Sequence, residues 1–346
     1  MNTLQKIVYT GIPTLLATLA LTMSGCSNDW TTPESLPINQ PTIQTQNPEL
    51  YAEYLEALRQ YKKEPHTMVY GWYDNSETTP YSRAHHMTVL PDSMDVVCLQ
   101  HPALIRGWQM AEMETVREEK GTRFIYDIDF DRFKAVYKSK QESATEEAPY
   151  ETTFQDFLLD SLQYALSLNQ KYHMDGICVR YMGKSKIHLQ PDELARYNNE
   201  EALFFGIVSD WARRNSSMHV AFLGNPQNVS DKTFFDRCQM VLASALTARS
   251  KDDFTFTLHM AGTEGVPSDK VGIVASGTYD SDTHKEKGYF ANGTLAGRGL
   301  AEWAPYDYNG QRAQAVGIQN IGPDYYSPSR VYDICRTLIE KTNPHK

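Results

Sequence analysis

The sequence contains few cysteines, and none is arranged as a metal or redox motif requires. Five cysteines occur among 346 residues, with no Cys-x-x-Cys pair and no cluster of histidine with cysteine. Cys98, Cys178, Cys238 and Cys335 lie in apolar runs rather than in turns, which favours buried free thiols over zinc ligands. We therefore predict no bound metal and no cofactor, and the remaining cysteine, Cys26, is assigned a different role.

Two further absences exclude whole classes of function. The formal net charge is −10, with 43 acidic against 33 basic side chains, so the chain lacks the excess of positive charge with which proteins bind nucleic acid. No glycine-rich phosphate loop follows the first predicted strand, which argues against a dinucleotide-binding sheet. Hydrophobic residues make up 41% of the sequence, which is enough to form the core of a globular domain. The 21 tyrosines suit either core packing or a sugar-binding surface.

The amino terminus has an apolar stretch that is too short to predict a membrane span. Lys6 precedes an apolar run from Ile12 to Met23, and small residues stand directly before Cys26. This order resembles a bacterial lipoprotein signal over residues 1–25, which implies that Cys26 is lipidated. An ordinary secretory signal with a chance cysteine is the alternative. Residues 26–47 are rich in Pro, Thr, Asn and Gln, which predicts a flexible tether.

Strand and helix patterns alternate along the rest of the chain, residues 48–346. Short apolar or β-branched runs bounded by turn residues predict strands, and amphipathic runs between them predict helices. Such alternation predicts a single α/β domain with the (β/α)8 barrel fold, and an open doubly wound sheet is the alternative. Residues 139–152 are polar and acidic and predict a loose loop. The predicted strands occupy residues 67–73, 94–99, 122–128, 173–182, 218–223, 238–242, 271–275 and 315–319.

The most informative stretch is residues 175–182, which read Asp-Gly-Ile-Cys-Val-Arg-Tyr-Met. Its outline resembles the fourth strand of glycoside hydrolase family 18, the chitinases and endo-β-N-acetylglucosaminidases, where the order is Asp-Gly-x-Asp-x-Asp-x-Glu. In that family the final glutamate protonates the leaving oxygen, and the aspartate two residues earlier orients the acetamido group of the substrate. After Asp175, the three acidic positions hold Cys178, Arg180 and Met182.

The replacement of these acids implies that the reaction has been lost. Side chains alternate between the faces of a strand, so Cys178, Arg180 and Met182 are predicted to point into the barrel and the intervening residues to pack outward. Methionine has no proton to donate, and arginine stays protonated. Loss of a general acid alone lowers a rate ~10²–10⁴-fold. Because a buried arginine needs an opposite charge, we predict that Arg180 pairs with Asp127 or Asp129.

The resemblance implies a surface-anchored, non-catalytic glycan-binding protein, similar to lipoproteins of Bacteroidetes glycan-utilisation loci. Its implied ligand is a GlcNAc-containing glycan such as an N-glycan, as a free oligosaccharide or on a glycoprotein. Its implied partners are an outer-membrane glycan importer and that importer's binding lipoprotein, and the lipid anchor would hold the chain on the outer membrane, exposed at the cell surface. The predicted ligand-binding residues are aromatic side chains and one amide near strand ends: Trp72, Tyr73, Asn225, Trp303, Tyr306 and Tyr308.

Two other functions remain open on the sequence. One is an active endo-β-N-acetylglucosaminidase or another glycosidase with relocated acids, because Asp74, Asp127, Asp129 and Glu302 lie at or near predicted strand ends, where barrel enzymes carry their active sites. The other is a scaffold protein without affinity for sugars, used for assembly in a surface complex.

Overall fold

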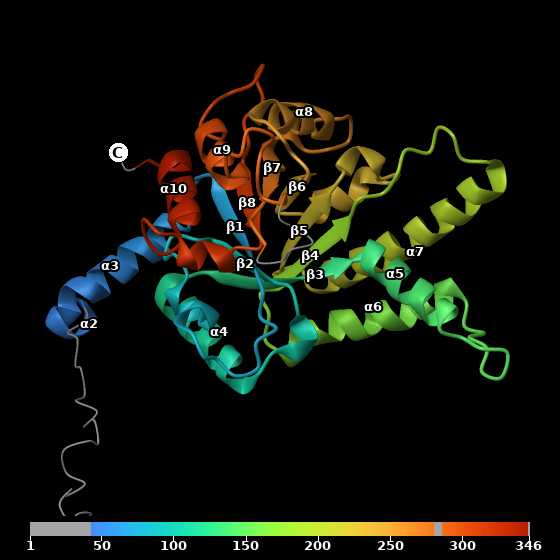
Figure 1. Ribbon diagram of the computed structural model, residues 1–346, viewed down its shortest axis with the longest axis horizontal. Helices are drawn as coiled ribbons and strands as arrows, with labels where there is room; N and C mark the ends of the chain where they lie inside the picture. The colour runs from blue at the N-terminus through green and yellow to red at the C-terminus, as the bar shows by residue number, and fades with distance from the viewer. Residues whose placement is uncertain (1–42, 280–285, 345–346) are drawn as a thin grey trace, which may run out of the picture. The chain divides into compact units, whose positions relative to one another are not determined.

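The computed structural model describes residues 43–279 and 286–344 (Figure 1). The chain divides into two units, Met1–Tyr51 and Ala52–Lys346. The predicted signal with Cys26 lies outside the described residues, as does most of the predicted tether. The last residues of that tether form the one-turn helix α2 (Ile43–Gln46). Over the described ranges, no helix combines the length and the apolar character needed to cross a bilayer.

Helix α3 (Pro48–Tyr61) begins at the first residue of the predicted α/β domain. Asn47 caps it, since its side-chain Oδ1 accepts a hydrogen bond from the main-chain N–H of Leu50 at 3.2 Å. Pro48 fills the first helical position, where the missing N–H is not needed.

The second unit contains a closed barrel of eight parallel strands that pair in chain order. Closure is shown by β1, which pairs with β8 on one side and with β2 on the other. The predicted (β/α)8 barrel is confirmed, and an open sheet is excluded. The strands are β1 (Met68–Tyr73), β2 (Val96–Leu99), β3 (Arg123–Asp129), β4 (Gly176–Tyr181), β5 (His219–Gly224), β6 (Met240–Ala245), β7 (Val271–Ser276) and β8 (Ala315–Gln319).

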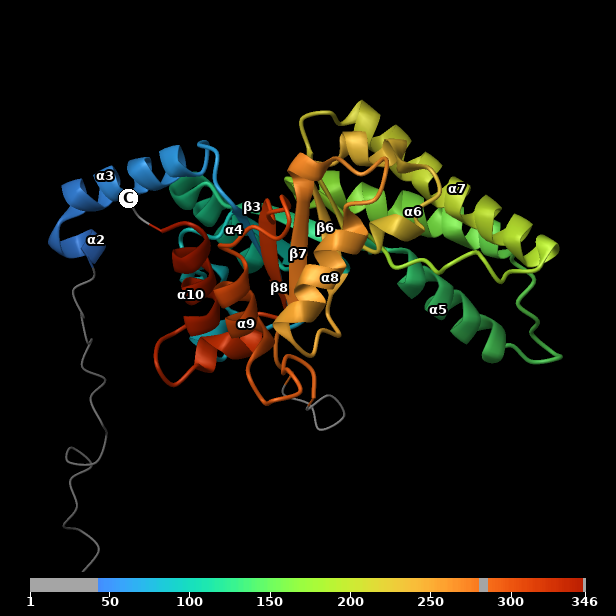
Figure 2. The same ribbon diagram turned by 90° about the horizontal axis from the view of Figure 1, so that it is seen from above.

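An α-helix follows each of six strands, whereas β1 and β5 are followed by short 3-10 helices alone. Helices α5, α6 and α7 lie side by side on one flank of the barrel in both views (Figures 1 and 2). The α-helices of the barrel are α4 (Gly107–Lys120), α5 (Phe130–Glu142), α6 (Phe154–Lys171), α7 (Pro191–Arg214), α8 (Lys251–Ala261), α9 (Ala296–Trp303) and α10 (Asp333–Thr342). The 3-10 helices are η1 (Arg83–His85), η2 (Met87–Val89), η3 (Pro102–Leu104), η4 (Pro226–Asn228), η5 (Lys232–Arg237), η6 (Ser268–Lys270) and η8 (Gly322–Tyr326).

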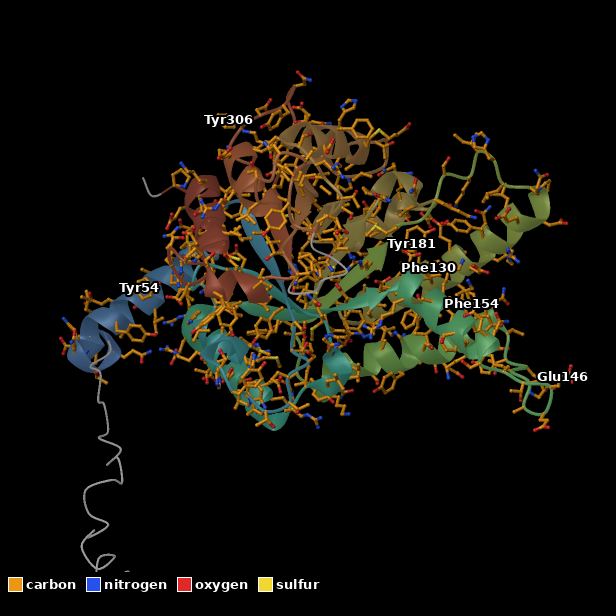
Figure 3. All side chains as sticks on the ribbon, in the orientation of Figure 1. Tyr54, Phe130, Glu146, Phe154, Tyr181 and Tyr306 are labelled. Carbon is orange, nitrogen blue, oxygen red and sulfur yellow. The ribbon has the colours of Figure 1, made fainter. Side chains whose placement is uncertain are left out.

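Two apolar cores separate the faces of the strands. Ile177, Val179 and Tyr181 belong to the outer core between the sheet and the helices, whereas Cys178 belongs to the inner core enclosed by the barrel. The outward packing predicted for Ile177, Val179 and Tyr181 and the inward direction predicted for Cys178 are therefore confirmed. Figure 3 shows Tyr181 facing Phe130 outside the barrel, with their ring centroids 5.3 Å apart.

Asp175 and Gly176, at the start of β4, make contacts of this strand with α4, β3 and β5. Asp175 Oδ1 and Oδ2 accept hydrogen bonds from Arg117 Nε at 2.9 and 3.0 Å, and Oδ2 also accepts the main-chain N–H of Phe124 at 2.7 Å. A Cβ atom on Gly176 would lie 1.8 Å from the carbonyl oxygen of His219, so no larger residue fits there. Both letters of the Asp-Gly pair thus have a structural role.

One predicted loop is partly helical. Residues 139–152 were predicted to be a loose loop, but α5 continues to Glu142. The sequence pattern concealed α5 because Phe130 is its one buried residue, so it carries little of the apolar stripe on which helix prediction depends. Its start is fixed instead by Asp129, whose Oδ1 accepts the main-chain N–H of Arg132 at 3.1 Å.

Candidate ligand-binding site

The carboxyl end of β4 places Arg180 in the mouth of the barrel beside two aspartates of β3. The pairing of the two strands sets Asp127 opposite Cys178 and Asp129 opposite Arg180. Arg180 Nη1 lies 3.6 Å from Asp127 Oδ2, and Arg180 Nε lies 3.5 Å from Asp129 Oδ2. The predicted pairing is confirmed, with both aspartates. Both distances exceed those of a good hydrogen bond, so the guanidinium keeps donor capacity for another partner.

Burial and charge oppose each other in this group. Burial raises the pKa of Asp129 above its usual value, and the neighbouring Arg180 reduces that shift without cancelling it. Burial alone would lower the pKa of Arg180, but Asp127 and Asp129 outweigh burial, and the pKa is raised. Arg180 therefore remains cationic, and Asp129 is protonated more easily than an ordinary aspartate.

Asp127 collects two further hydrogen-bond donors from inside the barrel. Its Oδ1 accepts from Trp72 Nε1 at 3.0 Å and from Cys98 Sγ at 3.1 Å. Cys98, Asp127 and Cys178 form the one group in the described part of the chain with the spacing of metal ligands. Burial raises the pKa of both thiols, and Arg180 adds positive charge. A metal ion would have to displace both thiol protons, so we assign this group to hydrogen bonding.

Met182 and Asn225 are joined by a loop contact. Met182, directly after β4, is half-buried, and its carbonyl oxygen accepts hydrogen bonds from Asn225 Nδ2 and Asn228 Nδ2, both at 3.0 Å. Asn225 was predicted to bind a sugar hydroxyl, and one of its amide hydrogens is thus engaged within the protein. It does lie at the carboxyl end of β5, on the same side of the barrel as Arg180.

The predicted stacking role of Trp72 and Tyr73 is corrected by their burial. Trp72 is 0% exposed and lies in the inner core, while Tyr73 is 2% exposed and lies in the outer core. Their polar ends are also engaged, because the Tyr73 hydroxyl donates to the carbonyl oxygen of Ala84 at 3.1 Å. At these exposures neither ring offers a face on which a sugar could stack, although Tyr73 borders a pocket at the barrel mouth.

The predicted cluster of Trp303, Tyr306 and Tyr308 lies at the other end of the barrel. These residues belong to the end of α9 and the segment that leads into β8, so they stand at the amino-terminal edge of the strands, away from Arg180. Trp303 is buried and stacks on Tyr308, with ring centroids 4.8 Å apart. Tyr306 is 64% exposed (Figure 3). The structure does not bring this cluster to the barrel mouth.

The other acids considered for relocated catalysis are separated in the same way. Asp74, after β1, lies on the mouth side, and its Oδ1 is 3.4 Å from His101 Nε2. Glu302 lies in the last turn of α9, and its Oε2 is 3.1 Å from Lys251 Nζ in the first turn of α8. Of these four candidates, Asp74 follows the carboxyl end of β1, and Asp127 and Asp129 lie at the carboxyl end of β3.

A pocket of about 480 Å³ opens at the mouth, where β1, β2, β7 and β8 end, and we call it the tyrosine pocket. Two of its residues are prominent, since Tyr81 is 81% exposed and Tyr326 is 60% exposed. Tyr81 packs edge-on against His85 with ring centroids 4.3 Å apart. The hydroxyl of Tyr326 lies 3.0 Å from Ser82 Oγ, which joins the loops after β1 and β8. Sequence reasoning missed these rings because their one signal is a position after a strand.

Unpaired polar atoms accompany the exposed rings. Within the described ranges, the buried atoms His85 Nδ1 and Gln100 Nε2 have no hydrogen-bond partner, and both residues line the tyrosine pocket. Gln319 Oε1 is also buried without a hydrogen-bond partner in the part of the chain that the structure describes, and Gln319 lines a second cleft at the mouth that is described below. Because nearly all buried polar atoms in proteins are paired, these atoms indicate that solvent or a ligand completes the site.

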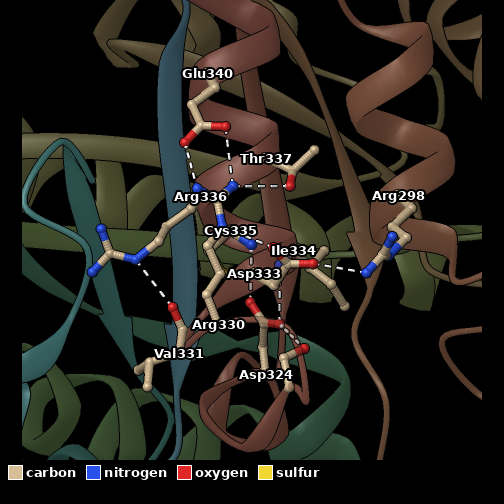
Figure 4. A network of polar contacts seen from close by, with 11 residues as sticks. Arg298, Asp324, Arg330, Val331, Asp333, Ile334, Cys335, Arg336, Thr337 and Glu340 are labelled. Atoms are coloured by element: carbon tan, nitrogen blue, oxygen red, sulfur yellow. Dashed lines mark hydrogen bonds and ion pairs between the residues drawn. The ribbon is translucent and has the colours of Figure 1, made fainter.

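The loop that carries Tyr326 is held in place by one carboxylate (Figure 4). Asp324 Oδ1 accepts the main-chain N–H of Ile334 at 3.0 Å, and Oδ2 accepts that of Cys335 at 2.9 Å. These bonds cap the first turn of α10 and fix η8 to it. The ring of Tyr326 is therefore positioned before any ligand arrives, which lowers the entropy cost of binding.

A second cleft of about 380 Å³ adjoins the tyrosine pocket, and Tyr279 lines both. We call it the arginine cleft, because Arg180 and Arg249 line it together with Lys287. The barrel mouth thus offers an aromatic compartment and a cationic compartment side by side.

A sequence profile described as glycoside hydrolase family 18, BT1044-like, matches residues 31–340. A search of curated proteins returns no significant match. Among solved structures, a glutamate-to-glutamine variant of BT1044 is similar with a TM-score of 0.61 and 17% identity, covering 87% of this chain and 95% of that chain.

Two further solved structures share the fold. An endo-β-N-acetylglucosaminidase from Cordyceps militaris has a TM-score of 0.61 and 13% identity, covering 84% of this chain and 96% of that one. A group II chitinase catalytic domain from Ostrinia furnacalis has a TM-score of 0.50 and 9% identity, covering 81% and 97%. Identities this low show a common architecture alone.

Proposed function

The chain belongs to the BT1044-like family within glycoside hydrolase family 18, and we propose that it binds a glycan at the mouth of its barrel without hydrolysing it. The observation that carries this proposal is the position of Arg180. In the resemblance of residues 175–182 to the family motif, Arg180 takes the place of the aspartate that orients the acetamido group. A guanidinium there repels the positive charge that develops during such a reaction, and Met182 offers no proton in place of the glutamate.

Retained binding is supported by the tyrosine pocket. Exposed rings such as Tyr81 and Tyr326 offer the flat apolar faces on which sugars stack, with a hydroxyl group at the edge of each ring. The unpaired polar atoms of His85 and Gln100 supply hydrogen-bonding positions beside them. A pocket that had only lost its reaction would keep these features, whereas a scaffold with no ligand has no use for them.

The ligand and the location form the broader part of the proposal. The family resemblance favours a GlcNAc-containing glycan, such as an N-glycan, as the ligand. The signal-like sequence that ends at Cys26 supports a lipid anchor and a place on the outer membrane, exposed at the cell surface. There the protein would pass its glycan to an importer and to that importer's binding lipoprotein.

An active glycosidase is the second candidate, favoured by one observation. Burial raises the pKa of Asp129, which is what a general acid requires. Against it, Arg180 lies 3.5 Å from that carboxylate, and the Asp129 side chain also caps α5.

One experiment separates the candidates. The protein is incubated with a high-mannose glycoprotein, released glycans are measured by mass spectrometry, and binding to a panel of N-glycans is measured by calorimetry. We expect binding without release, and a loss of affinity of about tenfold or more in Tyr326→Ala. Tyr306→Ala is the matched control, because it removes an equally exposed tyrosine at the opposite end of the barrel.

The other outcomes identify the other functions. Glycan release that disappears in Asp129→Asn would establish a glycosidase and overturn the non-catalytic proposal. No binding to any glycan of the panel would overturn glycan recognition and leave the scaffold function.

A further inference from the structure

We infer that the ligand carries an anionic group, a carboxylate or a sulfate ester, and that this group binds in the arginine cleft. The inference rests on the proposed function, since it concerns the class of glycan bound at the same barrel mouth. It is carried by the cations that line this cleft and by their contrast with the tyrosine pocket.

Three cationic side chains from different parts of the chain line the arginine cleft. Arg180 comes from β4, Arg249 from the residues between β6 and α8, and Lys287 from the segment before α9. Arg249 and Lys287 are exposed, while Arg180 lies deeper, with 17% of its side chain exposed. Cations that converge from separate loops on one cleft of about 380 Å³ form a site for an anion rather than a uniformly charged surface.

The arginines suit a planar or tetrahedral oxyanion. A guanidinium presents five N–H donors in a fixed fork and binds carboxylate or sulfate oxygens in pairs. The two ion pairs of Arg180 are 3.5 and 3.6 Å long, so Asp127 and Asp129 hold it in place without making close hydrogen bonds. Arg180 can therefore turn donors toward a ligand while its burial is still compensated.

Two further features favour an anion with a sugar attached. Helix α9 begins at this cleft with Ala296, whose main-chain N–H donates to the carbonyl oxygen of Gly288 at 2.8 Å, and the positive end of its helix dipole adds to the positive potential of the cleft. Gln319 Oε1 is buried without a hydrogen-bond partner in the described ranges. It offers an acceptor for a hydroxyl group next to the anionic substituent.

The acidic groups of the mouth are distributed unevenly. Among the described residues that line the arginine cleft, Glu286 is the one acidic residue. The described lining of the tyrosine pocket instead contains Asp74 and Glu77 and no arginine or lysine. Counting the aspartates behind Arg180 as well, the cationic side is close to neutral and the tyrosine side is negative. An anionic glycan would therefore be oriented, with its neutral sugars toward the tyrosines and its anion toward Arg180.

The test compares matched glycans by calorimetry with the intact protein. One pair is a disialylated biantennary N-glycan and its desialylated form, and the other is chitobiose with and without a 6-sulfate. We expect one anionic member to bind at least about tenfold more tightly than its neutral partner, and the pair that shows the difference identifies carboxylate or sulfate. Arg249→Gln combined with Lys287→Gln should abolish this preference, by lowering the affinity for the anionic member to that of its neutral partner.

The control variant combines Arg213→Gln with Lys138→Gln. It removes the same charge from exposed ion pairs on α7 and α5, outside the cleft, and it should keep the preference. Equal affinity within both glycan pairs, or a preference that the control also loses, would overturn the inference while the proposed function stands. Absence of binding to all four glycans would instead overturn the proposed function, and the inference with it.

Discussion

Replacement of Arg180 by methionine tests the charge balance at the barrel mouth. The variant leaves Asp127 and Asp129 on adjacent strands with no cation between them. Breaking a buried ion pair by removing one partner costs about 3–5 kcal/mol. The side chains here are 17%, 13% and 21% exposed, and solvent screening reduces the cost, so we expect about 2–3 kcal/mol at neutral pH. For a domain of this size that lowers Tm by roughly 4–6 °C.

The deficit of this variant should depend on pH in a defined direction. The pKa of Asp129 is already raised in the folded protein by burial, and loss of Arg180 raises it further. A carboxyl group whose pKa is raised by folding destabilises the fold when ionised, and this cost disappears as the pH falls toward the ordinary aspartate pKa of 3.8. The difference in Tm between Arg180→Met and wild type should therefore shrink between pH 7 and pH 4.

Thermal denaturation at a series of pH values measures both effects. Arg180→Met combined with Asp129→Asn should recover part of the lost stability, because one of the two facing charges is gone. Arg213→Met is the control, since Arg213 is exposed and pairs with an exposed aspartate. If Arg180→Met were as stable as wild type at pH 7, or less stable by the same amount at every pH, the proposed balance of charges would be wrong.

Three further variants test the structure around β4 and β5 by urea denaturation. Asp175→Asn should lower the free energy of unfolding by about 1–3 kcal/mol, because it weakens the paired bonds from Arg117, and unchanged stability would contradict that role. Gly176→Ala should prevent stable folding, because the new Cβ atom would clash with the carbonyl oxygen of His219. Gly206→Ala should instead stabilise α7 by up to about 1 kcal/mol, because the space around its Cβ position is open. Burial lowers the pKa of His219 to about 3, so below pH 6.5 the unfolded chain binds more protons than the folded chain. The free energy of unfolding should therefore fall by up to about 1.4 kcal/mol for each pH unit below 6.5. His219→Gln should flatten this slope.

The fold could be predicted because the barrel repeats one physical pattern. Each strand is buried on both faces, so its apolar run stands out from the turns around it. The direction of Cys178 and the pairing of Arg180 followed from strand parity and from the cost of a buried charge. Helix α5 could not be found in this way, because it rests on the barrel through Phe130 and leaves most of its surface to solvent.

The candidate binding surface was harder to predict, for a related reason. The sequence does not distinguish a tryptophan or tyrosine in the core from one in a cleft. Trp72 and Trp303 proved to be core residues. The rings that do line the mouth, Tyr81 and Tyr326, lie in loops without periodicity. Their position depends on the closure of β1 against β8, which brings together residues separated by more than two hundred positions in the chain.

The close approach of Gly176 to β5 has a consequence for how activity is inferred from sequence. The Asp-Gly pair is required by the construction of the barrel, whatever the barrel does. A sequence pattern that depends on Asp175 and Gly176 detects the barrel architecture and gives no information about the reaction. Transfer of a hydrolase label to chains like this one should therefore depend on the side chains at the far end of the strand, where Arg180 and Met182 stand.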